Sequence, residues 1–528
     1  MYQDVRTIDS IFSSAANESG GRTHLQFLDG TTATYAQTFE RAARLAGALR
    51  SRGVQQGDRV VCLMGNCGAL YEFFIATSLL GAIAVPINTQ STAYEIDRLI
   101  RDCAASGCVA EAERADLLSE EVKQRLSVRL SVPSAAQGWD DYEKAIAGAQ
   151  AVTDPQSRPA DPCLIIYSSG TTGDPKGIVL RQECLIENAV RVMERLKYSS
   201  DDVFLTLLPS FHLFGYSFDF MYSGMVRAPM IVMDSFDPER ALEHIEKYKV
   251  SVLTGVPTMF ARVFDSKQLA GHNVDSIRLL DVGGGPVSPA LKHRLKGLGI
   301  EAVESYGQTE ISTVSTVQIP GVDAPEGSCG PVLRDFQVRV VNVEGEDVPD
   351  GEPGELLFRS PTFMHGYWNQ PELTATTLRD GWLHSGDVGR VDAESNVYIL
   401  DRVKDMIVAN GFNVFPKEVE NAIGVHPAVL TVAVVGVQDE LRGEDIFAFV
   451  VRRPGTFASS EEIADHCTRH LARYKLPRYI SLVDELPLTA TGKIRRFKLR
   501  EIAGAEIASG HAFRVNAGKT AAGDRSAG

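Results

Sequence analysis

The sequence has little that would suit a membrane or a nucleic acid. Its 528 residues carry a formal net charge of −15, whereas a surface that binds nucleic acid nonspecifically is basic. The longest apolar stretch, Phe73–Ile87, includes Thr77, Ser78 and Pro86 and is shorter than the ~20 residues of a spanning helix. Residues 1–10 contain no basic segment followed by an apolar one. We therefore expect no nucleic-acid partner, no transmembrane segment and no secretory signal.

Cysteine is also sparse, with eight residues spread from Cys62 to Cys467. Two close pairs, Cys62/Cys67 and Cys103/Cys108, have no histidine or further cysteine pair at the spacing of a zinc site. We interpret the cysteines as buried free thiols in a reducing compartment, which predicts a cytoplasmic location. The sequence also lacks a G-x-S-x-G nucleophile elbow, so no serine-hydrolase mechanism is expected.

Strand-like and helix-like segments alternate through the first 400 or so residues. Asp58–Met64 is typical of a buried strand, Glu72–Leu80 of a helix and Gly81–Ile87 of the next strand. Met230–Met233 and Val252–Pro257 are further short apolar runs that end in turn residues. This alternation predicts an α/β fold with parallel-rich sheets layered with helices.

The chain is too long for one hydrophobic core, so we expect a large domain and a smaller mobile one. The sequence pattern changes near Asp401–Asp405, and the helices and strands expected beyond it suffice for a compact α+β domain. These are a helix at 417–423, strands at 429–437 and 446–451, and a helix at 460–474. We predict an N-terminal domain at 1–401, a C-terminal domain at 402–509 and a disordered tail at 510–528.

The strongest chemical signal is the run Tyr167–Gly177, which follows the apolar strand Leu164–Ile166. Its glycines and small hydroxylated residues let backbone N–H groups approach phosphate oxygens, and Lys176 adds positive charge. It is not a Walker A loop, because Pro175 stands where that motif has glycine before lysine.

This run resembles the phosphate loop of the adenylate-forming superfamily, which comprises acyl-CoA synthetases, amino-acid adenylation domains and luciferase. The resemblance continues in order over roughly residues 30–500. It implies that a carboxylate and ATP give an acyl-adenylate and pyrophosphate, and that coenzyme A then gives an acyl-CoA and AMP. It also implies Mg²⁺ as a cofactor. The ATP-binding residues it implies in this loop are Ser168, Ser169, Gly170, Thr171, Thr172, Gly173 and Lys176.

Two later segments resemble the family's nucleoside-binding motifs. In Tyr306–Glu310, the resemblance implies that Tyr306 stacks on adenine, Thr309 contacts the α-phosphate and Glu310 binds Mg²⁺, with Gly307 and Gln308 also at the nucleotide. Aromatic faces suit bases, and hard carboxylate oxygens suit Mg²⁺. By the same resemblance, Asp387 and Arg402 contact ribose and Lys404 is the hinge between the domains. Asp401 stands where the family usually has glycine.

The acyl pocket is implied by Leu208–Gly215, whose His212 borders the pocket in the family, and by the glycines before Pro286. Glycines present bare backbone to a flat adenine or a narrow acyl channel. We expect a hydrophobic carboxylic acid as substrate. The acyl-binding residues predicted are His212, Phe214, Tyr216, Val256, Gly283, Gly284 and Gly307, and Gly284, Gly285 and Pro286 are also placed at ATP.

The small domain carries the remaining family motifs. Leu488–Ile494 resembles the segment of the catalytic lysine, so Lys493 would bridge the carboxylate and the α-phosphate. Asn410, Gly411 and Phe412 would bind coenzyme A. With Lys493, the predicted catalytic residues are Thr309, Glu310 and His212.

Three other functions remain open. An acyl-AMP ligase would load a carrier protein in place of coenzyme A, although the run 354–402 lacks room for the insertion such relatives carry. An amino-acid adenylation enzyme needs an acid near His212, and the register of Asp219 does not fit that role. A non-catalytic nucleotide-binding relative would be expected to lose some of the motif residues. The identity of the acid and the oligomeric state are not predicted.

Overall fold

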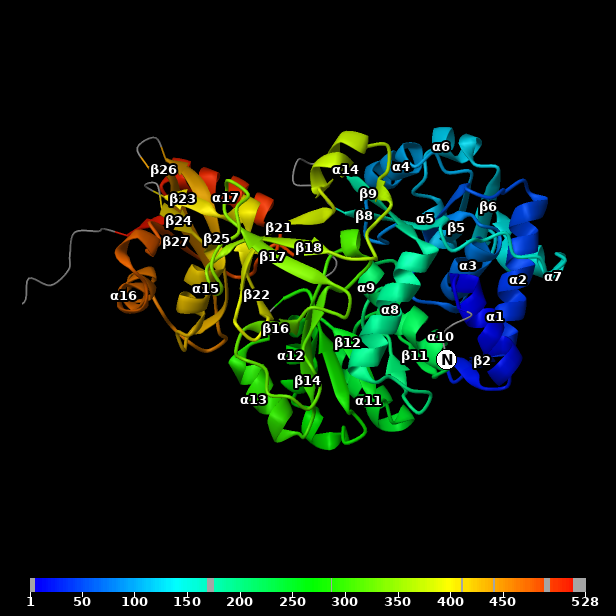
Figure 1. Ribbon diagram of the computed structural model, residues 1–528, viewed down its shortest axis with the longest axis horizontal. Helices are drawn as coiled ribbons and strands as arrows, with labels where there is room; N and C mark the ends of the chain where they lie inside the picture. The colour runs from blue at the N-terminus through cyan, green and yellow to red at the C-terminus, as the bar shows by residue number, and fades with distance from the viewer. Residues whose placement is uncertain are drawn as a thin grey trace, which may run out of the picture. The chain divides into compact units, whose positions relative to one another are not determined.

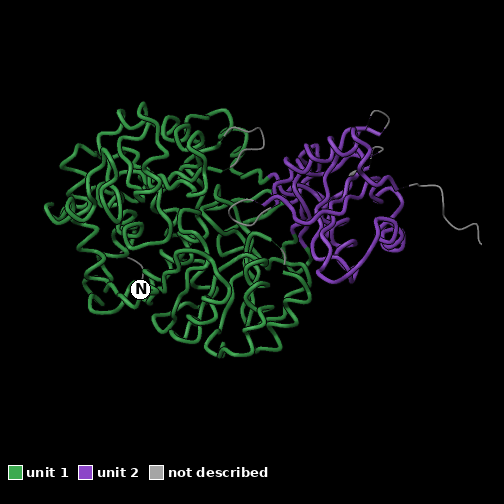
Figure 2. The backbone as a smooth tube through the Cα atoms, turned by 180° about the vertical axis from the view of Figure 1, so that it is seen from behind, with its two compact units in different colours: residues 1–339, 357–385, 392–398 green, residues 340–356, 386–391, 399–528 purple. Residues whose placement is uncertain are grey.

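The computed structural model describes residues 5–168, 175–285, 287–409, 412–439, 442–488 and 494–515. Contacts divide the chain into two compact units, coloured separately in Figure 2. Unit 1 comprises residues 1–339, 357–385 and 392–398, and unit 2 comprises residues 340–356, 386–391 and 399–528. Within the described ranges, no helix is both long and apolar enough to cross a membrane. The predicted domain boundary after residue 401 stays a prediction.

One sheet of unit 1 carries the glycine-rich and adenine motifs at the ends of its strands (Figure 1). Its central strands pair in parallel, and only the edge strands β15 and β2 are antiparallel. The predicted strands at 230–233 and 252–257 are confirmed here. In order across the sheet the strands are β15 (Thr316–Val317), β14 (Ala302–Tyr306), β13 (Leu279–Val282), β12 (Val252–Gly255), β10 (Phe204–Leu205), β11 (Met230–Val232), β1 (Thr23–Phe27) and β2 (Thr32–Thr34).

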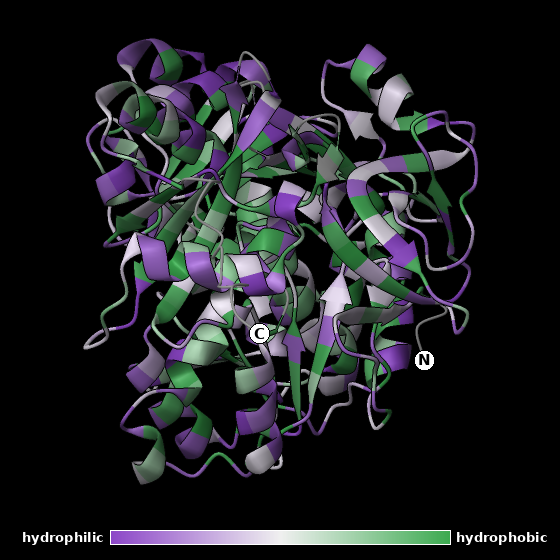
Figure 3. Ribbon diagram, turned by 90° about the vertical axis from the view of Figure 1, so that its left-hand side faces the viewer, coloured by the Kyte–Doolittle hydropathy of each residue, from purple (hydrophilic) through white to green (hydrophobic). Residues whose placement is uncertain are grey.

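Helices α11 (Pro238–Tyr248), α12 (Pro257–Phe264) and α13 (Pro289–Gly297) cover one face of this sheet. Each begins with proline, whose fixed φ and missing N–H suit the first helical turn. Leu253, Leu280 and Val282 point into this core. Because side chains alternate along a strand, the residues between them point to the opposite face. Figure 3 shows hydrophobic residues concentrated along the strands and hydrophilic ones on the outer helices.

A second sheet of unit 1 confirms the strands predicted at 58–64 and 81–87. It runs β19 (Gly366–Tyr367), β9 (Lys176–Arg181), β8 (Pro162–Ser168), β4 (Ile83–Pro86), β3 (Arg59–Leu63), β5 (Gly107–Glu111), β6 (Val128–Val132) and β7 (Asp140–Asp141). The predicted helix at 72–80 is α3 (Gly68–Leu79). Other helices of the first 200 residues are α1 (Ile8–Ser19), α2 (Tyr35–Ser51), α4 (Ala93–Asp102), α5 (Ala112–Ala115), α6 (Glu120–Arg125), α7 (Tyr142–Ala147) and α8 (Gln182–Leu196).

The segment after β10 contains the short helix α9 (Leu213–Gly215), the π-helix η1 (Tyr216–Met221) and α10 (Tyr222–Val226). Beyond the first sheet come η2 (Leu269–Gly271), η3 (Thr309–Ile311) and α14 (Pro371–Thr377). A further sheet runs β16 (Ser328–Pro331), β22 (Asn396–Arg402), β21 (Trp382–Val391), β18 (Gly354–Arg359) and β17 (Gln337–Val341), and β20 (Leu378–Arg379) pairs with β21.

Most of unit 2 is one sheet with a hydrophobic core on each face. Its strands are β24 (Phe412–Val414), β23 (Ile407–Ala409), β26 (Gly443–Arg452), β27 (Tyr479–Val483) and β28 (Phe513–Arg514), with β25 (Val429–Asp439) paired to β26. Its helical elements are η4 (Val403–Asp405), α15 (Pro416–Gly424), α16 (Ser460–His470), η5 (Arg473–Lys475) and α17 (Arg496–Ser509).

Two predictions for unit 2 need correction. The disordered tail was predicted to begin at residue 510, but Phe513 and Arg514 form β28 and pair with β27, and residues 516–528 lie outside the described residues. Gly510, with φ of +71°, ends α17 and turns the chain back towards the sheet. The helix predicted at 460–474 ends at His470.

Candidate active site

Lys176 and Glu310 are brought close to one tyrosine side chain. Strand β9 begins at Lys176, which lies opposite Ser168 in the antiparallel pair of β8 and β9. The Lys176 Nζ lies 5.6 Å from the centre of the Tyr367 ring, whose π face attracts a cation. The Tyr367 hydroxyl donates a hydrogen bond of 2.8 Å to Oε1 of Glu310. The predicted ATP-binding residues of the loop itself, Ser169, Gly170, Thr171, Thr172 and Gly173, lie outside the described residues.

The motif Tyr306–Glu310 follows from the end of β14, and a close backbone neighbour leaves room only for glycine at its second position. A Cβ added at Gly307 would lie 1.9 Å from the carbonyl oxygen of Thr313. Tyr306 is half-buried, and its ring centre lies 5.8 Å from that of Phe358. The Gln308 side chain donates a hydrogen bond of 2.9 Å to the carbonyl oxygen of Ser385. Thr309 and Glu310 follow in η3 and are half-buried.

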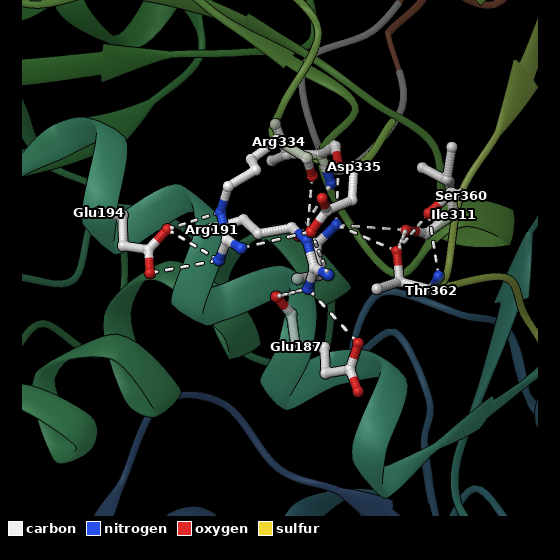
Figure 4. Close-up of polar contacts among 10 residues, drawn as sticks. Glu187, Arg191, Glu194, Ile311, Arg334, Asp335, Ser360 and Thr362 are labelled. Atoms are coloured by element: carbon white, nitrogen blue, oxygen red, sulfur yellow. Dashed lines mark hydrogen bonds and ion pairs between the residues drawn. The ribbon is translucent and has the colours of Figure 1, made fainter. Parts of the chain in front are cut away.

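Buried hydrogen bonds fix the far end of η3. Thr362 donates a hydrogen bond of 3.2 Å from Oγ1 to the carbonyl oxygen of Ile311 (Figure 4). Asn188 of α8 donates one of 2.8 Å to the carbonyl oxygen of Val314. Arg191, one turn later on α8, forms an ion pair of 3.0 Å with Asp335. The backbone that carries Thr309 and Glu310 is therefore attached to a helix and to a neighbouring loop.

The predicted acyl segment contacts the glycine-rich turn where Phe214 packs against Gly283. A Cβ added at Gly283 would lie 2.8 Å from Cζ of Phe214. His212 precedes α9 and accepts a hydrogen bond of 3.3 Å at Nδ1 from the Phe214 backbone N–H, which orients its imidazole. Gly284 has a φ of +77°, a conformation that favours glycine. Gly285 is exposed, and Pro286 lies outside the described residues.

Two residues predicted at the acyl group lie in the core. Tyr216 is only 2% exposed, and its ring packs edge-on against Phe74 of α3 with centres 4.7 Å apart. Val256 is 7% exposed and precedes Pro257, the first residue of α12. Their role in binding the acid stays a prediction.

The predicted ribose and hinge residues of unit 2 lie on β21, β22 and η4. Asp387 is buried and forms an ion pair of 3.3 Å with Nε of the half-exposed Arg402. Asp401 accepts a hydrogen bond of 2.8 Å from the backbone N–H of Lys417, near the start of α15. This residue, where the family usually has glycine, therefore stabilises the N-terminus of a helix. Lys404 is exposed in η4.

Of the residues predicted to bind coenzyme A or to act as the catalytic lysine, the structure describes only Phe412. Phe412 is 54% exposed, and its ring centre lies 4.9 Å from that of Tyr474. Asn410, Gly411 and Lys493 lie outside the described residues.

Comparison with known families agrees with this arrangement of motifs. The model of the AMP-binding enzyme family matches residues 12–368, and that of the AMP-binding enzyme C-terminal domain matches residues 418–493. The chain belongs to the AMP-binding enzyme family.

Similar proteins of this family act on several acids. The chain is 36% identical to a feruloyl-CoA synthase from Amycolatopsis sp, over 89% of this chain and 94% of that protein. It is 32% identical to an indoleacetate–CoA ligase from Aromatoleum aromaticum, over 91% of this chain and 95% of that protein. The anthranilate CoA ligase AuaEII, solved in complex with anthranoyl-AMP, superposes with a TM-score of 0.87 at 30% identity, covering 94% of this chain and 98% of that one.

This AMP-binding enzyme is accordingly an AMP-forming acid–CoA ligase that uses ATP, Mg²⁺ and coenzyme A. Glu310 suits the ion, because Mg²⁺ in nucleotide enzymes is held by one or two carboxylates together with substrate phosphates. Its Oε1 is already oriented by Tyr367. When bound, the ion would supply positive charge at the phosphates.

Sequence reasoning missed several residues of this region of the AMP-binding enzyme. Tyr367 was overlooked although it contacts both Lys176 and Glu310. Its only signal was the Gly-Tyr pair that begins the segment Gly366–Gln370. Asn188 was overlooked as well, because nothing distinguishes an asparagine in the middle of an amphipathic helix from a surface residue. Asp281 was overlooked too, because it lies among the apolar residues of β13.

Proposed function

We propose that the acid activated by this enzyme is aromatic and binds beside the contact between Phe214 and Gly283. The contact between these two residues carries the proposal. At Gly283 the absence of a side chain is required by the Phe214 ring, which packs directly against the backbone there. Phe218, one helical turn further on, packs edge-on against Phe214 with ring centres 4.9 Å apart. Aromatic rings favour such offset and edge-on neighbours.

The similar proteins support this choice of acid. A feruloyl-CoA synthase and an indoleacetate–CoA ligase are among them, and a similar solved structure holds anthranoyl-AMP. A long-chain aliphatic acid would need a long apolar channel, whereas the Phe214 ring fills the space beside Gly283. We therefore favour a ring over an extended chain.

Within this function, we propose that the chain's own groups act through charge and position. The carboxylate of the acid attacks the α-phosphorus of ATP and pyrophosphate leaves; the thiol of coenzyme A then attacks the acyl carbon and AMP leaves. Lys176 and Lys493 would stabilise negative charge on the phosphates, and Tyr306 would stack on adenine. Asp387 would accept hydrogen bonds from the ribose hydroxyls, with Arg402 beside it. Positioning of this kind is worth up to about 7–11 kcal/mol.

Separate half-reactions test these roles. Lys493→Ala is expected to lower acyl-adenylate formation by about 100- to 1,000-fold, the usual effect of losing one group that stabilises charge in the transition state. Thioester formation from synthetic acyl-adenylate should remain largely intact. If Lys404 in η4 is the hinge, Lys404→Pro should spare the first half-reaction and slow the second, because proline fixes the local φ. Equal loss of both half-reactions in the Lys493 variant would contradict its role.

The substrate is tested by a panel of aromatic and aliphatic acids with ATP and Mg²⁺, with and without coenzyme A, and identification of products by mass. Aromatic acyl-CoA is the expected product. Turnover of aliphatic acids alone would refute the aromatic site. Acyl-adenylate that accumulates and ignores coenzyme A would favour a carrier protein as acceptor.

We also propose a cytoplasmic location. All eight cysteines are free and most are buried. Burial raises the pKa of the Cys467 thiol to about 12, so this thiol is unreactive. Unpaired thiols of this kind are typical of reducing compartments, where ATP and coenzyme A are also found.

A further inference from the structure

A layer of buried polar side chains lies on the face of the first sheet opposite the helices α11–α13. Thr254 of β12 and Asp281 of β13 are register partners in a parallel pair, so their side chains point to the same face. Both are fully buried. Oγ1 of Thr254 and Oδ2 of Asp281 have no hydrogen-bond partner. The other carboxylate oxygen of Asp281 accepts a hydrogen bond of 2.7 Å from Oγ of Ser305.

Two further unpartnered oxygens of this layer come from residues outside the sheet. Asp219 of η1 is 1% exposed, and its Oδ2 has no partner. Burial, and after it the charge of Asp281, raise the pKa of Asp219 well above its usual range. Tyr198 follows α8 and is 7% exposed, with an unpartnered hydroxyl. Burial and then the charge of Asp281 likewise raise the pKa of Tyr198. Helical elements and two strands thus direct polar groups into one buried region.

Such a layer is costly unless something completes its hydrogen bonds. A buried polar group without a partner costs roughly 1–3 kcal/mol, and four such oxygens lie here. Two neighbouring buried carboxyl groups cannot both ionise readily, so they retain a proton between them. They still offer more acceptor oxygens than the surrounding residues can satisfy. The hydroxyls of Thr254 and Tyr198 can donate or accept, whereas the unpartnered oxygens of Asp219 and Asp281 are completed by a hydrogen-bond donor.

The layer directly adjoins the proposed acyl site. Gly283 lies two residues after Asp281, directly beyond the end of β13. Oγ of Ser305, which donates a hydrogen bond to Asp281, lies 3.3 Å from the position that a Cβ would take at Gly283. Asp219 directly follows Phe218, whose ring packs on Phe214. An acid whose ring lies against Phe214 and Gly283 would direct its far end towards Asp219 and Asp281.

We propose that the acid carries a hydrogen-bond donor, a hydroxyl or an amino group, at the end of its ring remote from the carboxylate, and that Asp219 and Asp281 accept hydrogen bonds from it. This inference rests on the proposed aromatic site. It adds two specificity residues that take no part in nucleotide binding. A substrate that lacks the donor would leave the same oxygens unpartnered in the complex, which is how a polar site discriminates most strongly.

Three cinnamic acids of similar size test the proposal: the 4-hydroxy, 4-amino and 4-methyl derivatives. For the unaltered enzyme we expect kcat/KM of acyl-CoA formation to be about 10- to 100-fold higher with either donor than with the methyl group. The ratio between the hydroxy and amino acids identifies the preferred donor. Asp219→Leu should lose this preference or favour the methyl acid. Asp9→Asn is the matched control, because Asp9 is a buried acid whose carboxylate is hydrogen-bonded to Ser78 and Ser157.

The outcomes separate this inference from the function on which it rests. If no aromatic acid gives acyl-adenylate, the proposed function fails, and the inference with it. If all three acids react with equal kcat/KM, the aromatic site stands and the inference is overturned. Asp219→Asn keeps the size of the side chain and serves if the leucine variant does not fold. An unchanged preference among the three acids in a folded Asp219 variant would also overturn the inference.

Discussion

Two polar regions of unit 1 differ in how their hydrogen bonds are completed. On the proposed nucleotide side, Glu310 accepts a hydrogen bond from Tyr367, Gln308 donates one to Ser385, and the backbone of Ile311 is fixed by Thr362. On the acyl side, Asp219 and Asp281 each keep a buried oxygen without a partner. The first region follows the end of β14 and includes Tyr367 from β19 of the second sheet, whereas the second lies on one face of the first sheet.

The two regions therefore have different expected effects on activity and on the choice of acid. A region whose polar groups are already held by the protein is preorganised, and it can serve ATP whatever the acid. A region with unpartnered groups is completed by its ligand, and so it distinguishes one ligand from another. Changes on the nucleotide side should therefore lower activity with every acid by the same factor. Changes on the acyl side should alter the ratios between acids.

Glu310→Gln should give the largest effect. Loss of the carboxylate charge is expected to lower kcat/KM by about 100- to 1,000-fold, the range for one preorganised electrostatic group. The factor should be the same for 4-hydroxy- and 4-methylcinnamic acid. Steady-state kinetics with both acids measure it. A factor that differs strongly between the two acids would remove the distinction between the regions.

The stability of the acyl-side layer should depend on pH. Burial raises the pKa of Asp281 from 3.8 to about 7, so between these values the folded chain holds a proton that the unfolded chain releases. The free energy of unfolding therefore falls as pH rises from about 4 to 7, by up to about 1.4 kcal/mol per pH unit from this group. The Asp281→Asn variant does not lose stability in this way. The difference between its free energy of unfolding and that of the unaltered protein should therefore grow in favour of the variant from pH 5 to pH 7.

Urea unfolding at the two pH values measures this advantage. Thr254→Val removes an unpartnered oxygen of the same layer without removing a titratable group, so its effect on stability should be equal at both pH values. A constant difference for Asp281→Asn would mean that Asp281 ionises in the folded protein as it does in the unfolded chain.

Much of the nucleotide side could be predicted from the sequence because its residues are contiguous. Tyr306–Glu310 and Tyr167–Gly177 are read within single segments, and the strands before them are short apolar runs. What the sequence could not provide was the partner of each residue. Tyr367 lies 57 positions from Glu310, and nothing local to either indicates the hydrogen bond between them.

The acyl-side layer could be predicted even less. Asp281 interrupts the apolar strand Leu279–Val282, which is still buried on both faces. Only the register of β12 with β13 places Thr254 beside it. Asp219 was considered as a partner for an amino acid's α-amine and set aside because its register did not fit. Its relation to Asp281 depends on how η1 packs over the sheet, which the sequence does not indicate. The residues proposed for specificity are thus brought together by tertiary contacts, whereas the residues proposed for the shared chemistry lie in contiguous sequence motifs.

Gly283→Ala should have an intermediate effect that depends on the acid. The added methyl would lie 2.8 Å from the Phe214 ring, and overpacking of this kind typically costs about 1–3 kcal/mol. We expect kcat/KM for ring-bearing acids to fall about tenfold through KM. Phe214→Leu in the same chain should restore part of it by relieving the contact. Gly297→Ala, at a position with open space, is the control. No change in KM would place the acid elsewhere.

Tyr367→Phe should give the smallest effect and still test the preorganised side. The variant keeps the ring near Lys176 and removes only the hydrogen bond to Glu310. Because Glu310 is half-buried, water can replace part of that bond, and we expect about a fivefold loss of kcat/KM. Because Tyr367 orients Glu310, the proposed Mg²⁺ ligand, loss of its hydroxyl should also raise the Mg²⁺ concentration needed for half-maximal rate. Tyr142→Phe removes a buried hydroxyl bonded to Glu72, remote in sequence from every motif, and should leave the Mg²⁺ dependence unchanged. If Tyr367→Phe also leaves it unchanged, Glu310 is oriented by other contacts and the nucleotide side is less completely preorganised than its hydrogen bonds indicate.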